Sequence, residues 1–179
     1  MPTADVDAKH TIIELTHTTM YDVYVAVEDS ATPVRNRLDT VKKVEFSTAL
    51  DTEPPTFPTG FPDVFGIADT DFYMSFQLSE PGTVHYVVLQ DPEGGVAPKP
   101  NPSDLIVPEV AFPTVPHGSV DVPVVGETVT TYVEGLVLST SYSVYVIAQD
   151  KAVPTRNRQV DSTRLSVFTV EGALSLWAL

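Results

Sequence analysis

The stretch Leu136-Val-Leu-Ser-Thr-Ser-Tyr-Ser-Val-Tyr-Val-Ile-Ala-Gln-Asp150 decides the fold, and the chain contains it twice. The earlier copy is Leu15-Thr-His-Thr-Thr-Met-Tyr-Asp-Val-Tyr-Val-Ala-Val-Glu-Asp29. In both copies a short polar segment leads into β-branched and aromatic residues at nearly every second position, which is typical of a half-buried β-strand. The copies lie 121 residues apart, and ten of seventeen positions are identical between 21–37 and 142–158. The chain therefore contains an internal repeat.

Further short β-prone runs lie between turns rich in Pro and Gly, and no window combines helical periodicity with helix caps. This pattern predicts an all-β chain with the architecture of a β-sandwich. We expect strands at 10–15, 21–28, 41–47, 71–78, 84–89, 128–136, 142–149 and 163–170, with broken β-like pieces at 105–115 and 119–125.

Residues 49–62 form the clearest linker, because four prolines in fourteen residues remove backbone donors and favour an extended course. This linker separates an N-terminal arm and incomplete sandwich at 1–48 from a complete sandwich at 63–170. The complete sandwich carries an insert at 91–118. An apolar tail, 171–179, follows it.

A motif resemblance accompanies the repeat. At 15–21 and at 136–142, Leu is followed by Thr four residues later and by Tyr six residues later, directly before an alternating strand. This resembles the passage from strand E to strand F in fibronectin type III domains, and 80–86 resembles their turn from strand B to strand C. The resemblance implies a fibronectin-III-like or immunoglobulin-like sandwich, with structural tyrosine corners at Tyr21 and Tyr142. The usual Trp of strand B is missing, and the insert at 91–118 enlarges the region from strand C to strand E.

The two copies are unequal in what precedes them. Residues 1–48 have room only for strands equivalent to E, F and G, so the chain is one complete domain plus an N-terminal half-domain. Such a remnant would expose apolar side chains and a strand edge to water. Two interpretations remain open. The chain is an excerpt of a longer tandem array, or a neighbouring copy donates the missing strands and the copies join head to tail into a fibre.

Two segments are candidate strand donors. The tail 172–179 holds the only Trp of the chain and ends on apolar residues, and the arm 1–14 is the second candidate. The candidate assembly residues are apolar side chains of these segments and of the half-domain: Ile12, Ile13, Leu15, Val23, Val25, Phe46, Leu174, Leu176, Trp177 and Leu179.

Composition excludes several classes of function. The net charge is −14 with only ten Lys plus Arg, which disfavours nucleic-acid binding because a phosphate backbone needs a basic surface. The absence of Cys excludes disulfides, thiolate catalysis and Cys-ligated zinc. There is no apolar run of eighteen residues, so we expect no membrane span. The segment after Met1 lacks signal-peptide features, and a protein at the cell surface would carry its signal upstream or have lost it.

No constellation of residues predicts chemistry. The four His residues lack metal-ligand spacing, and the short acidic doublets offer too few oxygens for Ca²⁺. There is no phosphate loop and no nucleophile elbow. We therefore expect no catalytic residue, no cofactor and no metal. We also expect that the protein is not an enzyme. Asp29 and Asp150 follow the repeated strand, where Asx hydrogen bonds or pairing with Arg35 and Arg156 would explain them.

The expected function is that of a non-catalytic extracellular structural subunit that assembles head to tail into a filament, with other copies of itself as partners. The alternative is a binding or adhesion module, such as a carbohydrate-binding module, excerpted from a longer secreted tandem-repeat protein. Glycans are expected either as bound ligands or as O-linked sugars. The O-linked sugars would be attached to the Ser-, Thr- and Pro-rich stretches 51–60, 98–103 and 113–119.

Overall fold

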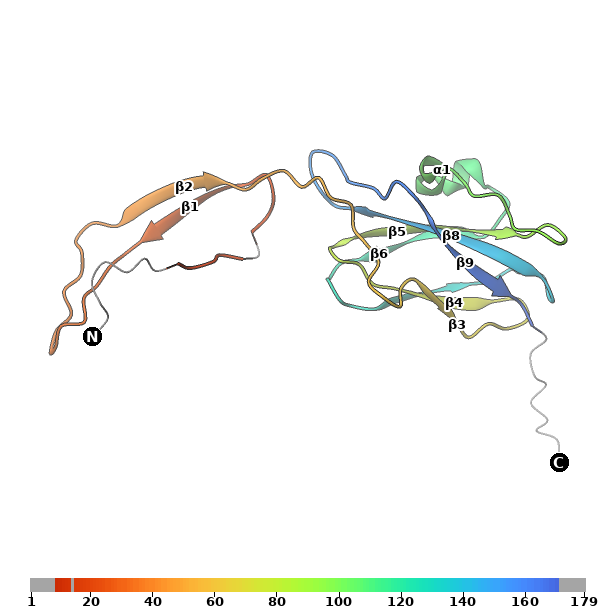
Figure 1. Cartoon of the computed structure of the whole chain (residues 1–179), viewed down its shortest axis with the longest axis horizontal. Coiled ribbons are helices and arrows are strands. Elements are labelled where there is room, and N and C mark those ends of the chain that lie inside the picture. Colours follow the sequence, from red (N-terminus) through yellow and green to blue (C-terminus); the bar gives the residue numbers. More distant parts are fainter. Residues whose placement is uncertain (1–8, 14, 171–179) are drawn as a thin grey trace, which may run out of the picture. The chain divides into compact units, whose positions relative to one another are not determined.

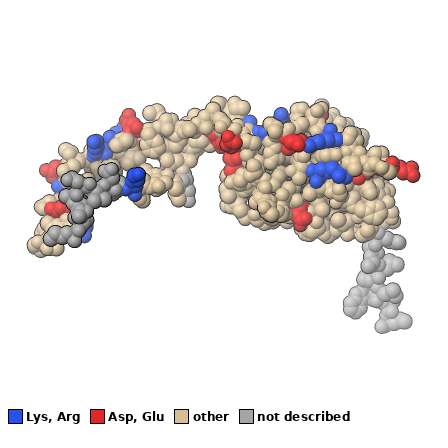
Figure 2. All heavy atoms as spheres, viewed as in Figure 1, with Lys and Arg blue, Asp and Glu red and all other residues tan. Residues whose placement is uncertain are grey.

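The computed structural model describes residues 9–13 and 15–170. The chain divides into two compact units, Met1–Asp51 and Thr52–Leu179. The division falls inside the Pro-rich stretch 49–62. No helix in the described ranges is long and apolar enough to cross a membrane. Uncharged residues cover most of the face of each unit that Figure 2 shows.

The second unit contains two antiparallel sheets, so the all-β class is confirmed (Figure 1). The first sheet has the order β3-β4-β7, with bounds Asp63–Phe65, Phe72–Phe76 and Val129–Val133. The second has the order β6-β5-β8-β9, with bounds His117–Val122, Gly82–Gln90, Ser141–Asp150 and Thr163–Phe168. The arrangement is that of a fibronectin-III-like or immunoglobulin-like sandwich.

Alternation along the central strands builds the core between these sheets. Every second residue of β4, β5 and β8 points inward and is buried, because successive side chains of a strand lie on opposite faces. The inward set comprises Phe72, Met74, Phe76, Val84, Tyr86, Val88, Tyr142, Val144, Val146 and Ala148. Strand β8 lies at the centre of its sheet, between β5 and β9.

The insert forms two short helices, α1 (Pro102–Ile106) and α2 (Pro108–Ala111). The expected β-like piece at 105–115 is therefore wrong over 105–111. Each helix begins with Pro, which is favoured at the first helical position. Helices of four and five residues are too short to show a helical period in the sequence. Leu105 is fully buried and packs on the outer face of β5 and β8, where α1 lies in Figure 1.

The first unit contains a single antiparallel hairpin of β1 (Met20–Val25) and β2 (Lys42–Ser47). Its register pairs Tyr21 with Phe46 and Val23 with Val44. The predicted strand at 10–15 is not formed in the part of it that the structure describes. A β-prone run becomes a strand only when a neighbour pairs with its backbone, and in the described part of this unit none pairs with it.

Candidate assembly surface

The hairpin of the first unit repeats part of the second unit, element by element. At the offset of 121 residues, β1 falls on the first six residues of β8, and β2 falls on β9 over its whole length. The isolated bridge between Glu28 and Arg37 likewise falls on the bridge between Gln149 and Arg158. The two hairpins therefore share their strand starts, their register and the bridge, while β8 runs four residues beyond the equivalent of the end of β1.

The Tyr at the second position of each strand, Tyr21 in β1 and Tyr142 in β8, binds backbone upstream. The Tyr142 hydroxyl accepts a hydrogen bond from the Val137 N–H at 2.8 Å, and the Tyr21 hydroxyl accepts one from the Thr16 N–H at 2.8 Å. This is the geometry of a tyrosine corner in both copies. The hydrogen bonds of Thr16 lower the pKa of the Tyr21 phenol below its ordinary value. The corner at Tyr21 is thus formed without a surrounding sandwich.

A threonine after the second strand closes each corner in the same way. Thr169 Oγ1 accepts the Thr140 N–H at 2.9 Å and donates to the Val137 carbonyl at 2.7 Å. Thr48 Oγ1 accepts the Thr19 N–H at 2.9 Å, and it donates to the Thr16 carbonyl at 2.7 Å. Local hydrogen bonds therefore hold both hairpins in one conformation.

Asp29 and Asp150 organise the two equivalent loops. The Asp150 carboxylate accepts hydrogen bonds from the backbone of Ala152 and Asn157, at 3.1 and 2.7 Å, and from the Asn157 amide at 2.7 Å. Asp29 makes the same set, with Asn36 in the place of Asn157. These bonds, with the Asn36 side chain first, lower the pKa of Asp29. The Asx prediction is confirmed.

The alternative pairing of these aspartates with arginine is wrong. Arg35 forms its ion pair with Glu28, and no ion pair joins Asp150 to Arg156 among the described residues. The reason is geometric, since the loop amides already satisfy the carboxylate of each aspartate.

The environments of the two hairpins differ completely. In β8, the alternating side chains are buried by the opposite sheet on one face and by the insert on the other. In the first unit the same positions are half-buried or exposed, and Val27 is 57% exposed where Ala148 is fully buried. The inner face is nevertheless apolar in both copies. In the first unit its apolar residues are Tyr21, Val23, Val25, Val27, Val44 and Phe46, and Lys42 lies opposite Val25 at one end.

The edge of the hairpin is open as well. Strand β8 pairs with β5 over nine residues, whereas β1 pairs only with β2 in the described part of the chain. An unpaired edge beside an apolar face is a template for another strand. The candidate site is this surface, which we call the open hairpin: the inner face of β1 and β2 together with the free edge of β1.

The structure places the predicted assembly residues unevenly. Val23 and Val25 lie on the open hairpin, and Phe46 stacks on Tyr21 with ring centroids 5.9 Å apart. Ile12 and Ile13 are exposed outside any strand, and Leu15 is half-buried at the start of the corner. The four tail residues, Leu174, Leu176, Trp177 and Leu179, lie outside the described residues.

Two residues of the site were missed from the sequence, namely Val27 and Val44, and so was Tyr24 on the opposite face of β1. Their equivalents Tyr145 and Ala148 are buried, and that of Val44, Leu165, packs against the core. The offset of 121 residues would have found them, because it transfers each position of β8 and β9 to the first unit.

Comparisons with known proteins show a likeness to solved structures. No protein-family model matches the chain, and no curated protein matches it. The crystal structure of the FN1–FN3 domains of chicken CNTN1 is similar at 17% identity and a TM-score of 0.38, over 90% of this chain. The chain spans 46% of that structure's length.

Proposed function

We propose that this chain is a non-catalytic structural subunit of an extracellular or cell-surface filament, in which the open hairpin receives strands from a neighbouring copy. One observation carries the proposal. Two hairpins share their corners, loops and strand pairing, yet only one of them is covered by the other strands of a sandwich. The apolar inner face of the open hairpin is the face that a sandwich buries.

The size of the apolar face sets what a partner must supply. Burying a Val or Phe side chain contributes roughly 1.5–3 kcal/mol, so the six inner-face side chains offer on the order of 10 kcal/mol. Association costs about 4–15 kcal/mol in lost freedom, before side chains are ordered. A donor that covers only part of the face therefore binds weakly, and strand pairing along the edge of β1 has to add to it.

The strand count restricts the donor. Each chain has two equivalent hairpins and one set of covering strands, β3 to β7, which is already used in the second unit. Exchange of that set between copies would leave as many open hairpins as before. The donor in a filament is therefore a segment outside the set, and the apolar tail 172–179 is the one we propose. Head-to-tail donation of this kind is a heterologous contact, which propagates.

The repeat spacing favours one alternative. At an offset of 121 residues, the second unit starts directly where the first hairpin ends, as successive sandwiches of a tandem array would. In that case a further set equivalent to β3–β7 covers the open hairpin. The chain would then be part of a binding or adhesion module, such as a carbohydrate-binding one, in a longer secreted protein.

Negative-stain microscopy and sedimentation of the purified chain test the filament. We expect polymers that lengthen with concentration, and their loss when 172–179 is deleted. A chain that stays a soluble monomer at all concentrations contradicts the filament. Polymers that persist after the deletion assign the donor to another segment.

A chimera tests the alternative. Residues 52–135 placed directly before residue 15 would give the open hairpin the same covering strands that the second hairpin has. We expect this chimera to be a stable monomer with two sandwiches. An unfolded first unit in the chimera would show that the open hairpin cannot be completed by β3–β7.

A further inference from the structure

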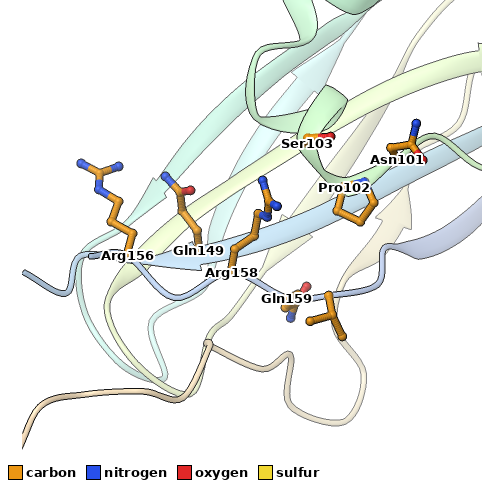
Figure 3. Close-up of a pocket in the computed structure, with 8 residues that line it drawn as sticks. Asn101, Pro102, Ser103, Gln149, Arg156, Arg158 and Gln159 are labelled. Carbon is orange, nitrogen blue, oxygen red and sulfur yellow. The ribbon is translucent and has the colours of Figure 1, made fainter. Parts of the chain in front are cut away.

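A hollow of about 550 Å³ in the second unit brings two arginines together beside the insert (Figure 3). Arg156 and Arg158 come from the loop after β8, and Gln149 comes from β8 itself. The side chains of these three residues extend to the same side in Figure 3. Asn101, Pro102 and Ser103, at the start of α1, line the hollow across from them.

The first unit shows what two arginines at this spacing can bind. There Arg35 Nη1 pairs with Glu28 Oε1, and Arg37 Nε pairs with Glu28 Oε2 at 3.1 Å. One carboxylate is therefore held by two guanidinium groups at once. Both loops carry the same backbone bridge, from Glu28 to Arg37 and from Gln149 to Arg158.

The second unit lacks that carboxylate. Gln149 stands at the position of Glu28, while both arginines are retained as Arg156 and Arg158. Across 9–13 and 15–170 the structure gives neither arginine an ion pair, although the chain has 24 acidic residues. Guanidinium groups stay charged at all physiological pH values and bind planar or tetrahedral oxyanions with paired N–H donors.

The neighbouring polar groups suit the same ligand. The Gln149 amide and the Ser103 hydroxyl are further donors at the wall of the hollow. Gln159 supports the wall, because its amide accepts the Ala148 N–H at 3.0 Å and donates to the Pro55 carbonyl at 2.8 Å. Donors thus line part of the hollow, beside Pro102 and Val160, and hydrogen bonds hold Gln159 in its wall.

We propose that this hollow binds an oxyanion, the carboxylate, phosphate or sulfate group of a ligand, in the place that the Glu28 carboxylate takes in the first unit. Arg156 and Arg158 hold the oxyanion by charge-assisted hydrogen bonds, and Gln149 donates a third. The inference does not depend on assembly of the open hairpin.

Titration calorimetry of the whole chain with sulfate, phosphate and acetate tests the proposal, with chloride at equal ionic strength as the reference. We expect one site for at least one of the oxyanions. The Gln149→Glu variant restores the arrangement of the first unit and should weaken binding by about tenfold or more, because bonds to charged groups are worth about 1.5–3 kcal/mol. We expect this variant to fold, because the first unit already has Glu28 at the equivalent position.

The matched variant Glu28→Gln opens the arginine pair of the first unit. It should add a second site of similar affinity in the same titration. Preference for sulfate and phosphate assigns a tetrahedral ligand, and preference for acetate assigns a carboxylate. Binding no tighter than that of chloride, or equal binding by Gln149→Glu, overturns the proposal.

An independent readout is the titration of His85 by NMR. Burial lowers the pKa of this imidazole, and the charge of Arg156 lowers it further. An oxyanion on Arg156 cancels part of that charge, so bound sulfate or phosphate should raise the pKa of His85 in the natural chain. The shift should be absent in Gln149→Glu, and an equal shift in both chains contradicts binding at this site.

Discussion

Tyr24 and Tyr145 occupy the same position of two equivalent hairpins, and Tyr145 is 3% exposed while Tyr24 is 64% exposed. The Tyr145 hydroxyl donates a buried hydrogen bond to the Ala97 carbonyl at 2.6 Å, and its ring packs with Leu105 of the insert. Tyr24 has the same ring and hydroxyl without these neighbours. A partner that completed the first unit on the pattern of the second would bring an apolar cover and an acceptor for Tyr24.

Removing the hydroxyl of Tyr145 and that of Tyr24 should change the free energy of unfolding by different amounts. Tyr145→Phe leaves the buried carbonyl of Ala97 without its donor, which should cost about 1–3 kcal/mol of unfolding free energy. Tyr24→Phe in the unassembled chain should change stability by less than about 0.5 kcal/mol, as exposed substitutions do. Denaturant unfolding measures both, and equal costs would contradict the difference in burial.

Truncation on the inner face gives a second matched pair. Val146 is fully buried, so Val146→Ala should cost about 1.5–3 kcal/mol through lost burial and a cavity. Its equivalent Val25 is 44% exposed, and Val25→Ala should leave the unfolding of the second unit unchanged. In the assembled state Val25→Ala should weaken association instead. Sedimentation at several concentrations measures that loss, and unchanged association would remove Val25 from the interface.

Gly82 marks a close approach between β5 and β8. A Cβ on Gly82 would lie 2.6 Å from the carbonyl oxygen of Gln149, which is backbone and cannot swing away. Gly82→Ala should therefore destabilise the second unit by about 1–3 kcal/mol, as overpacking does. Gly95→Ala is the control, because its Cβ would meet only the Pro92 ring, at 3.2 Å, among side chains. Similar melting temperatures for the two variants would disprove the close approach.

The pH dependence of stability should report His85. Burial and then Arg156 lower the pKa of His85 in the folded chain below the ordinary value of 6.5, and Glu109 opposes them in part. Its Nε2 has no hydrogen-bond partner among the residues that the structure describes. As pH falls below about 7, the unfolded chain binds this proton before the folded chain does, so stability decreases with acidity. The stability that comes from keeping His85 neutral is fully present above the pKa of His85 in the unfolded chain. It is lost as pH falls toward the lower pKa of His85 in the folded chain.

Replacement of His85 checks that assignment. His85→Leu should flatten the stability curve between about pH 7 and pH 5, where an ordinary imidazole titrates. Urea unfolding at a series of pH values measures the slope. An unchanged slope in the variant would assign the acid sensitivity to other groups.

Residue spacing predicted the features that depend on short sequence distances. The repeat placed Tyr21 and Tyr142 at the starts of their strands, and Asp29 and Asp150 at loops where Asx bonds form. These contacts are local, so spacing alone defines them. The alternation of apolar and polar residues in β4 and β8 likewise predicted the all-β class. A core between two sheets requires that alternation, because successive side chains of a strand lie on opposite faces.

Features that depend on tertiary partners were not predictable. The strand expected at 10–15 failed because no neighbour pairs with it in the described part of the first unit. The helices of the insert form where Leu105 can pack on Val87, Tyr145 and Ile147, which no local pattern reveals. The exchange of Glu28 for Gln149 was visible in the repeat, but its meaning required the paired guanidinium groups of the first unit.

Amide hydrogen exchange along β1 tests the central claim most directly, namely that the open hairpin is completed by another polypeptide segment. The measurement compares residues 20–25 in dilute and in concentrated solutions of the whole chain, with 141–146 of β8 as the internal reference. If another segment completes the hairpin, the amides of β1 should exchange much faster than those of β8 in dilute solution. As the concentration rises, the exchange rates of the β1 amides should fall toward those of β8. Fast exchange of β1 at every concentration, with β8 protected throughout, would contradict the claim.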